Sequence, residues 1–322
     1  MSYVIAQSEL LELSLVVPVF NEEATVLLFI DHINTLFKQH LDIQIEYIFV
    51  NDGSTDTTLT LLLNEQKHHS HIKIIDLSRN FGKEAALTAG LLAATGQVIV
   101  PIDVDLQDPP ALIFDMIAKW KEGFEVVLAH RVSREKDSMA KKTSASLFYK
   151  LHNKIAWPAI PENVGDFRLM DRCVIEALKE LPESRRFMKG IFAWLGFHTA
   201  YLDYNRSARI AGTTKFNAWR LWNFALEGIT SFSTSPLKIS TYIGLGVSLA
   251  SFIYALIIVM KVVINGIDVP GYASIMVTVT FLGGLQLMGI GILGEYLGRT
   301  YIESKRRPTY IVRRIYSVEE KS

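Results

Sequence analysis

Two stretches of the chain contain no charged residue, residues 239–260 and residues 269–294. Each is long enough to cross a bilayer as a helix, which takes about 20 apolar residues. The connector between them, KVVINGID (261–268), is short, so we expect the two segments to form a hairpin. A hairpin buried inside a soluble protein is the less favoured alternative. The sequence therefore predicts a domain that is followed by two transmembrane helices.

Basic residues are unevenly placed around this hairpin, and they predict its orientation. Positive charge concentrates on the cytoplasmic side of membrane proteins, so we expect the tail and the preceding domain to be cytoplasmic. The N-terminal residues MSYVIAQSELLEL contain neither a basic region nor a cleavage site, and we expect no signal peptide. The connector contains one basic residue, Lys261, whereas the chain after the second span contains Arg299, Lys305, Arg306, Arg307, Arg313 and Arg314.

Charge and cysteine content exclude several classes of protein. The 322 residues include 33 basic and 33 acidic side chains. A net charge near zero argues against a nucleic-acid binder, which usually has a basic domain. The one cysteine, Cys173, excludes an internal disulfide framework and a cysteine zinc cluster. We expect it to be a small buried apolar residue.

The chain before the hairpin alternates short apolar runs with longer segments of helical period. This order predicts a mostly parallel sheet covered by helices, which we expect to be complete before the first span. Residues 22–39 and 82–95 are the clearest helical segments. The expected strands are LSLVVPVF (13–20), IEYIFV (45–50), IKIIDL (72–77), QVIVPID (97–103) and FEVVLAH (124–130).

Polar clusters follow the first four expected strands. Ligands bind beyond the carboxyl ends of parallel strands, where these clusters would meet. Any one of them is also a common turn sequence, because Asn, Asp, Gly and Ser favour turns. Four together favour a nucleotide site. The clusters are NEE (21–23), NDGSTD (51–56), SRNFGK (78–83) and DVDLQD (103–108).

The fourth cluster contains candidate metal ligands. Asp103 and Asp105 are two residues apart, so on an extended backbone they project to the same side, with Gln107 next in that row. Oxygen ligands of this kind suit Mg²⁺ or Mn²⁺ together with substrate phosphates. An ordinary turn remains the alternative for this short motif. Asp108 precedes Pro109 and is expected to be a helix N-cap.

Six motifs, taken in order, resemble those of the family 2 glycosyltransferases that load a sugar onto a polyprenyl phosphate. The C-terminal GEYLGRTYIESKRRPTYIVRR and the two spans extend the resemblance across nearly the whole chain. Within that family the chain is most similar to the bactoprenol glucosyltransferases of O-antigen modification systems. The motifs are PVFNEE, NDGSTD, NFGKEAALTAGL, DVDLQDPP, NVGDFRLMDR and GTTKFN.

The resemblance implies an α/β, Rossmann-like GT-A fold, a Mg²⁺ or Mn²⁺ ion and inversion at the anomeric carbon. It implies UDP-glucose as donor and undecaprenyl phosphate as acceptor. GDP-mannose, UDP-galactose and UDP-aminoarabinose stay open as donors, because the sequence alone does not show which side chains contact the sugar. A processive polysaccharide synthase is disfavoured, because a Q-x-x-R-W motif and further spans are not found. A non-catalytic nucleotide-binding scaffold is disfavoured by the intact acidic motif.

Donor-site residues are carried over from matching motif positions. Asp103 would lie against the nucleotide and also join Asp105 and Gln107 around the metal. Three basic residues just before the amphipathic segment 216–229 would close over the phosphates; without the family they would be assigned to surface charge. The implied nucleotide-sugar residues are Pro18, Phe20, Glu22, Asp52, Lys83, Asp103, Arg206, Arg209 and Lys215.

The acceptor phosphate would be bound by Arg131, Lys142 and Ser146. Related enzymes often have arginine at the position of Lys142, and lysine would bind phosphate as a point charge. Asp166 is implied to be catalytic, either as a base or as a positioning group. Pairing of Asp166 with Arg168 or Arg172 is the structural alternative.

We divide the chain into a cytoplasmic glycosyltransferase domain (1–215), interfacial amphipathic helices (216–238), the hairpin (239–298) and a basic tail (299–322). Apolar and Trp residues at helical spacing in 143–157 and 216–229 are interpreted as membrane contacts, with packing on the domain core as the alternative. The expected location is the bacterial inner membrane. The resemblance implies coupling to a flippase and a second glucosyltransferase. GEYLG (294–298) leaves a homo-oligomer open.

Overall fold

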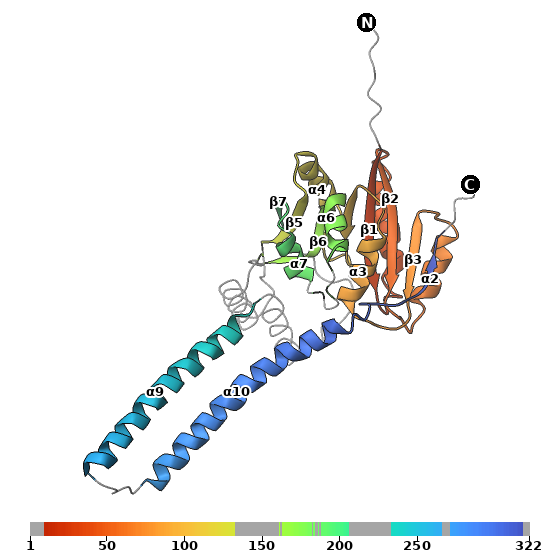
Figure 1. The fold of residues 1–322 in the computed structure, drawn as a ribbon. Coiled ribbons are helices and arrows are strands. Elements are labelled where there is room, and N and C mark those ends of the chain that lie inside the picture. The colour runs from red at the N-terminus through yellow and green to blue at the C-terminus, as the bar shows by residue number, and fades with distance from the viewer. Residues whose placement is uncertain are drawn as a thin grey trace.

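The structure is a computed structural model that describes residues 10–132, 161, 163–181, 183, 186, 188–205, 233–265 and 271–317. Its described strands form one eight-stranded sheet in the order β7-β5-β6-β4-β1-β2-β3-β8 (Figure 1). Four of the neighbouring pairs are parallel, and the three pairs β4·β6, β5·β6 and β3·β8 are antiparallel. The predicted mostly parallel α/β sheet is confirmed.

All five strands expected from apolar runs are present. Their residues are buried on both faces, as expected for strands that helices cover on each side. β4 is shorter than expected, because it ends at Pro101. The strands are β1 (Leu11–Val19), β2 (Ile43–Asn51), β3 (Ile72–Leu77), β4 (Val98–Pro101) and β5 (Val126–Arg131).

Helices pack on both faces of the sheet and enclose two hydrophobic cores. One face packs against α1 (Val26–Phe37), α2 (Thr58–Gln66) and α4 (Leu112–Lys121). The other face packs against α3 (Lys83–Ala93), α6 (Arg172–Lys179) and α7 (Met188–Leu195). The two helices expected at 22–39 and 82–95 are thus α1 and α3.

β6 (Val164–Asp171) and β7 (Thr199–Tyr204) extend the sheet beyond the five expected strands. β6 runs antiparallel between β4 and β5, and β7 pairs with β5. Successive side chains of a strand point to opposite faces. Phe167 therefore packs in the core on the α1 side, whereas Val164 and Met170 pack on the α3 side. Asp166 and Arg168 share the α3 side.

The expectation that the sheet is complete before the hairpin is wrong. β8 (Val312–Tyr316) lies after both long helices and pairs antiparallel with the edge strand β3. In Figure 1 the blue C-terminal segment accordingly lies beside β3 and α2. The Gln66 side chain donates to the main-chain oxygen of Tyr316 at 2.8 Å. Part of the predicted basic tail is therefore an edge strand of the domain.

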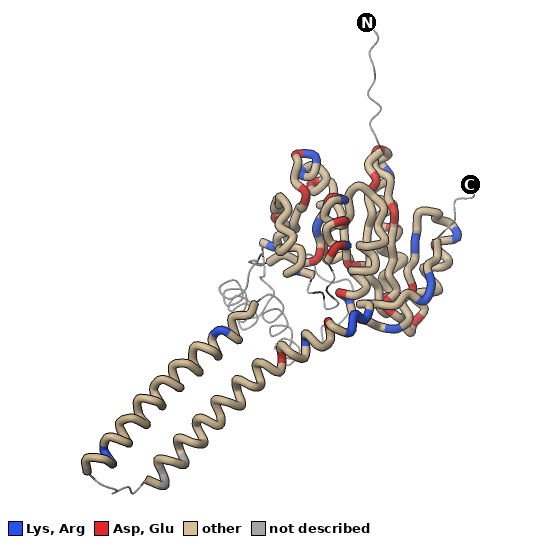
Figure 2. The backbone as a smooth tube through the Cα atoms, viewed as in Figure 1, with Lys and Arg blue, Asp and Glu red and all other residues tan. Residues whose placement is uncertain are grey.

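Two long helices, α9 (Ser235–Asn265) and α10 (Tyr272–Ser304), project together from one end of the domain (Figure 1). Within them, Ser235–Lys261 and Val277–Ser304 are apolar and long enough to cross a membrane, and neither is buried by the rest of the protein. Figure 2 shows them nearly free of charged residues, which instead crowd the domain. The Tyr296 hydroxyl donates to the main-chain oxygen of Ser233 at 2.6 Å and ties the two helices together near the domain.

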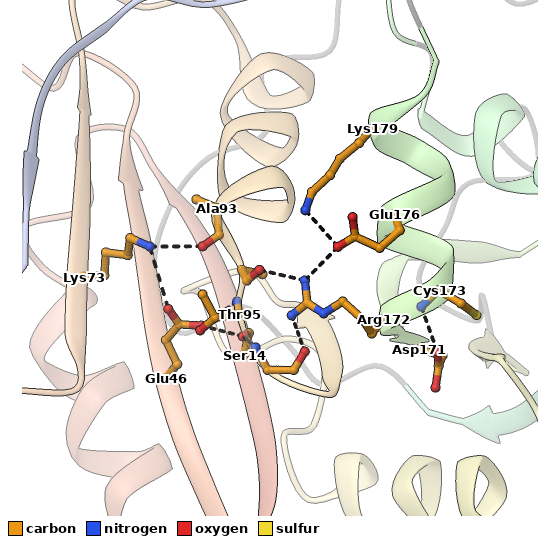
Figure 3. A network of polar contacts seen from close by, with 12 residues as sticks. Ser14, Glu46, Lys73, Ala93, Thr95, Asp171, Arg172, Cys173, Glu176 and Lys179 are labelled. Atoms are coloured by element: carbon orange, nitrogen blue, oxygen red, sulfur yellow. Dashed lines mark hydrogen bonds and ion pairs between the residues drawn. The ribbon is translucent and has the colours of Figure 1, made fainter.

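A polar network ties the end of α3 to the sheet (Figure 3). The Glu46 carboxylate accepts hydrogen bonds from the hydroxyls of Ser14 at 2.6 Å and Thr95 at 2.8 Å. Lys73 donates to the main-chain oxygen of Ala93, the last residue of α3, at 3.1 Å. These bonds satisfy polar groups at the end of a buried helix, which would be costly to leave unpaired. They fix the direction of α3.

Cys173 is exposed near the start of α6, so its expected burial is wrong. Its main-chain N–H donates to the Asp171 carboxylate at 2.8 Å, and Asp171 is the N-cap residue of that helix. The first helical turn is solvent-exposed on this side, and a cysteine there is not part of the apolar core.

Candidate active site

A cavity of about 330 Å³ lies at the carboxyl ends of β1, β2 and β4 and the start of α3. All four polar clusters identified in the sequence contribute residues to it, and the third and fourth clusters contribute three each. It is the crevice expected for a ligand in a parallel sheet. The predicted donor residues that line it are Pro18, Phe20, Glu22, Asp52, Lys83, Asp103 and Asp105.

Asp52 is buried and is held by the loop that follows β3. Its carboxylate accepts the main-chain N–H groups of Phe81 at 2.7 Å and Gly82 at 2.9 Å. Burial raises the pKa of Asp52, although these two hydrogen bonds oppose the shift. Next to it, Gly53 has φ 67°, and a β-carbon there would lie 2.5 Å from the main-chain carbon of Arg79. Only glycine fits where the two loops touch.

The loop after β1 is bound to the loop after β2. Asn21 adopts a left-handed conformation with φ 56°, which asparagine tolerates better than most residues. Its main-chain N–H donates to the Ser54 hydroxyl at 3.0 Å, and its side-chain oxygen accepts the Thr55 N–H at 2.8 Å. The rim of the cavity that contains Phe20 and Glu22 is therefore held in place before any ligand binds.

Asp103 follows the end of β4 and Asp105 lies in a turn, so the extended strand expected to run through both is wrong. Both nevertheless line the cavity. Leu106 follows with φ 53°, a conformation that costs a non-glycine residue about 1 kcal/mol or more. Gln107 is buried and does not line the cavity; its main-chain N–H donates to the Asp105 carboxylate at 3.2 Å. The structure thus brings two of the three predicted ligands to the cavity.

Two carboxylates facing one cavity fit a Mg²⁺ or Mn²⁺ ion, which commonly binds one or two carboxylates together with substrate phosphates. Among the described residues, no three His, Cys, Asp or Glu side chains form a group that would hold an ion alone. The donor set therefore fits such an ion, which Asp103 and Asp105 would hold together with a bound phosphate.

Lys83, the first residue of α3, lies between the carboxylates of Asp103 and Asp166. Its ammonium lies 2.7 Å from the Asp103 carboxylate and 2.9 Å from that of Asp166. Partial removal from water would lower the pKa of Lys83, but the two carboxylates dominate and raise it. Lys83 is therefore charged, and it holds two acids from different strand ends close together.

Asp166 is ionised in this environment. Burial would raise its pKa, but the charges of Lys83 and Lys189 outweigh burial and lower it to about 2. The alternative considered from the sequence, in which Asp166 pairs with Arg168 or Arg172, is wrong. Arg168 donates to the main-chain oxygens of Gly165 and Asp166, and Arg172 donates to main-chain oxygens after α3. The Asp166 carboxylate pairs with Lys83 instead.

Arg131 lies at the end of β5 and is oriented by two residues that sequence analysis did not assign to it. Its Nε donates to the Tyr204 hydroxyl at 2.9 Å, and its Nη2 lies 3.6 Å from the Asp108 carboxylate. The Tyr204 hydroxyl also donates to Asp108. A β-carbon on Gly165 would lie 2.7 Å from Arg131 Nη2, so the missing side chain lets the guanidinium approach β6.

The predicted N-cap role of Asp108 is wrong. Helix α4 begins at Leu112 with Ala111 as its N-cap residue, and Asp108 is buried beside Arg131 and Tyr204. Asp-Pro-Pro is a good helix-start signal, but here a partner 96 residues further along the chain determines the position of the carboxylate. Tertiary context has overridden the local preference.

Sequence analysis missed two further ionisable groups near Asp166. Lys189, at the start of α7, interacts electrostatically with Asp166 and Glu84, and burial lowers its pKa. Within the described part of the chain, Lys189 forms no hydrogen bond or ion pair. Glu84 accepts the Met188 main-chain N–H at 3.3 Å. Burial and the charge of Asp166 raise the pKa of Glu84 to about 7.

Five predicted site residues lie outside the described residues, as do the amphipathic segments 143–157 and 216–229. Their roles stay predictions. They are the acceptor residues Lys142 and Ser146 and the phosphate-closing residues Arg206, Arg209 and Lys215.

Glu84→Gln is expected to stabilise the protein at pH 8 and to have a smaller effect at pH 5. The folded protein raises the pKa of Glu84 from 4.5 to about 7, so it binds this proton more tightly than the unfolded chain. That contribution is complete below pH 4.5 and is lost as the pH rises through 7. Glutamine mimics the protonated acid, and the gain at pH 8 should be about 1 to 3 kcal/mol.

Thermal unfolding of both proteins at the two pH values measures this effect. Glu122→Gln is the matched control, because Glu122 is exposed and pairs with Lys119 on the surface of α4. A gain for Glu84→Gln that is equal at pH 5 and pH 8 would show that titration of Glu84 does not cause it.

Comparison with known families gives two matches along the chain. Residues 14–179 match the family described as "Glycosyl transferase family 2". Residues 235–300 match the family described as "GtrB C-terminal hairpin". The first match covers the candidate site up to Asp166, and the second covers both long helices.

Similar proteins span nearly the whole chain. A prophage bactoprenol glucosyl transferase homolog of Escherichia coli K12 is 52% identical over 95% of this chain and 99% of that protein. The bactoprenol glucosyl transferase of Shigella phage SfV is 50% identical over 94% and 98%. Among solved structures, a mannosyltransferase of Pyrobaculum calidifontis in complex with GDP-Man and Mn²⁺ is 18% identical, with a TM-score of 0.48 over 88% of this chain and 86% of that one.

Proposed function

This chain belongs to glycosyl transferase family 2, and on that premise we propose that it transfers glucose from UDP-glucose to undecaprenyl phosphate with inversion at the anomeric carbon. It is a glycosyltransferase associated with a membrane. One observation above all supports the proposal: Lys83 pairs with an acid of the donor cavity and with Asp166 on the acceptor side. This arrangement would bring the two proposed substrate sites to the same group.

UDP-glucose would occupy the cavity lined by Phe20, Asp52 and Asp103. Asp103 and Asp105 would hold Mg²⁺ or Mn²⁺, which supplies charge neutralisation for a leaving pyrophosphate. Lys83 would add a second positive charge beside the same phosphates. The relatives named bactoprenol glucosyl transferase favour glucose over the other sugars.

Undecaprenyl phosphate would place its head group near Arg131, Lys189 and Asp166. A phosphate monoester is already largely ionised near neutral pH, since its second pKa is about 6. A carboxylate with a pKa of about 2 is a poor proton acceptor, because efficient general bases have a pKa near the working pH. We therefore assign Asp166 the role of a positioning group. Lys189, which forms no hydrogen bond or ion pair within the described residues, would bind the phosphate.

The long apolar helices bring this site to its acceptor. Extracting an isoprenoid from the bilayer costs roughly 0.8 kcal/mol for each buried CH₂, so a chain of tens of carbons stays in the membrane. We assign the hairpin to the bacterial inner membrane, with the catalytic domain on the cytoplasmic face. A non-catalytic scaffold would share this placement but not the turnover.

A panel of radiolabelled sugar nucleotides, incubated with membranes that contain the protein, tests the reaction. We expect label from UDP-glucose to enter the lipid fraction, and this transfer to require a divalent ion. Label from GDP-mannose, UDP-galactose or UDP-aminoarabinose would overturn the donor assignment. Absence of lipid label from every donor, with nucleotide still bound, would favour the scaffold.

Cysteine labelling tests the topology. In a variant that lacks Cys173, a cysteine introduced at Asn265 should react with an impermeant reagent added outside intact cells, and one at Ser317 should not. Asn265 is the last residue of α9 and lies within the 261–268 connector, whereas Ser317 follows β8 in the domain that we propose to be cytoplasmic. Labelling at both positions, or at Ser317 alone, would contradict the proposed orientation.

A further inference from the structure

The last strand of the chain, β8, carries an arginine that contacts the end of β3. The family matches cover residues 14–179 and 235–300, so neither extends to β8. We infer that Arg313 is a positioning residue for donor binding, which holds the loop after β3 in the conformation that presents Asp52. This inference rests on the proposed function, because it assumes that the nucleotide binds the cavity around Asp52.

An irregularity in the β3·β8 ladder places Arg313 next to this loop. Asp76 is opposite Arg314 and Leu77 is opposite Val312, so Arg313 has no residue opposite it. An extra residue of this kind re-aims its side chain out of the regular alternation. The Arg313 guanidinium accordingly lies 3.4 Å from the Asp76 carboxylate and donates to the Ser78 main-chain oxygen at 2.7 Å.

Two short routes lead from Arg313 to the donor cavity. The first route runs through Asp76 to the loop after β2. The Asp76 carboxylate accepts a hydrogen bond from the Asn51 side-chain amide at 2.8 Å, and the Asn51 side-chain oxygen accepts the Ser54 N–H at 3.3 Å. The second route runs through Ser78 to the loop after β3. That loop continues to Phe81 and Gly82, whose N–H groups hold the Asp52 carboxylate.

The contact with Asp76 matters because the Asp76 carboxylate is buried, although Arg313 itself is exposed. The Asp76 side chain is 2% exposed, whereas Arg313 is 59% exposed. A buried carboxylate needs its partners, since an uncompensated charge in the interior is costly. An exposed ion pair alone contributes little, so the effect must arise at the buried end. We therefore expect a moderate weakening of donor binding rather than unfolding.

Three variants of the full-length protein test the inference: Arg313→Ala, Arg313→Lys and the control Arg314→Ala. Arg314 is on the same strand but lies over the Tyr316 ring, 5.0 Å from its centroid. Arg313→Ala should weaken UDP binding about tenfold, as expected for the loss of a hydrogen bond by a charged group, and should raise the donor KM with little change in the KM for lipid phosphate. Arg313→Lys should recover part of the loss, and Arg314→Ala should match the unaltered protein.

Hydrogen exchange of residues 78–82 gives a readout that needs no nucleotide. Arg313→Ala should speed exchange of this segment in the free protein, while the Arg314→Ala control should not. Unchanged exchange overturns the inference, and so does an equal rise in both KM values. If the unaltered protein bound no UDP, the proposed donor would fail, and the exchange result would still decide whether Arg313 positions the loop.

Discussion

Alanine in place of Asp105 is expected to abolish the metal dependence of nucleotide binding and to reduce transfer by about a thousandfold. Asp103 and Asp105 are the two carboxylates of the DVDLQD cluster that face the donor cavity. With one of them removed, an ion that prefers near-octahedral oxygen coordination keeps a single protein carboxylate. Charge neutralisation by such an ion is worth several kcal/mol, and each 1.4 kcal/mol is a factor of ten.

Calorimetric UDP affinity, measured with and without Mn²⁺, tests this directly. Arg131→Ala is the informative comparison, because Arg131 lies outside the cavity and is held by Tyr204 and Asp108. It should leave UDP affinity nearly unchanged and raise the KM for lipid phosphate by roughly tenfold to a hundredfold, since a charge-assisted contact is lost. If both variants weaken UDP binding equally, Arg131 belongs to the donor site and our acceptor assignment fails.

Asp166→Asn is expected to lower kcat by about a hundredfold or more while both substrates still bind, because a slight misplacement of the reacting groups can cost that much. The substitution keeps the shape of the side chain but removes the charge that pairs with Lys83 at 2.9 Å. Lys83 would then interact with Asp103 alone and lose its link to the acceptor side. Single-turnover rates, together with separate affinities for UDP and lipid phosphate, distinguish this from a binding defect.

Asp171→Asn is the matched control, because Asp171 ends the same strand and accepts hydrogen bonds from Trp120 and Cys173 away from the cavity. We expect it to lower thermal stability and to leave kcat within a fewfold of the unaltered protein. An Asp166→Asn variant with normal kcat would remove Asp166 from the reaction. One with a lowered melting temperature and no folded fraction would instead assign Asp166 to the fold.

The central part of the fold follows from local sequence patterns. β1, β2 and β3 are runs of apolar, mostly β-branched residues that are buried on both faces, and such runs are readable without knowledge of their neighbours. β6 and β8 were missed for a physical reason. Each contains an arginine whose partner lies in another element: Arg168 stacks on Phe192 of α7, and Arg313 pairs with Asp76 of β3. A charged strand of this kind looks like a loop or a tail.

The residues of the candidate site also divide into those that a local sequence pattern predicts and those that it does not. Pro18, Asp52 and Asp105 belong to motifs at the carboxyl ends of expected strands, and the structure brings them to one cavity. Tyr204 and Lys189 carry no motif and approach the site through β7 and α7, so no local pattern could have found them. For Asp108 the local pattern was misleading. Its sequence context predicts a helix N-cap, but its carboxylate contacts Arg131.

The return of the chain from α10 to the sheet limits how the domain can move relative to the bilayer. Seven residues, 305–311, separate Ser304 at the end of α10 from Val312 at the start of β8, a reach of at most about 25 Å. A domain joined to a pair of helices by one flexible link can rotate about every axis. This domain is joined to the long helices by two links, because α9 follows β7 in the chain and β8 follows α10. The short link 305–311 therefore keeps the β3 edge of the sheet, where β8 pairs, within this reach of the end of α10.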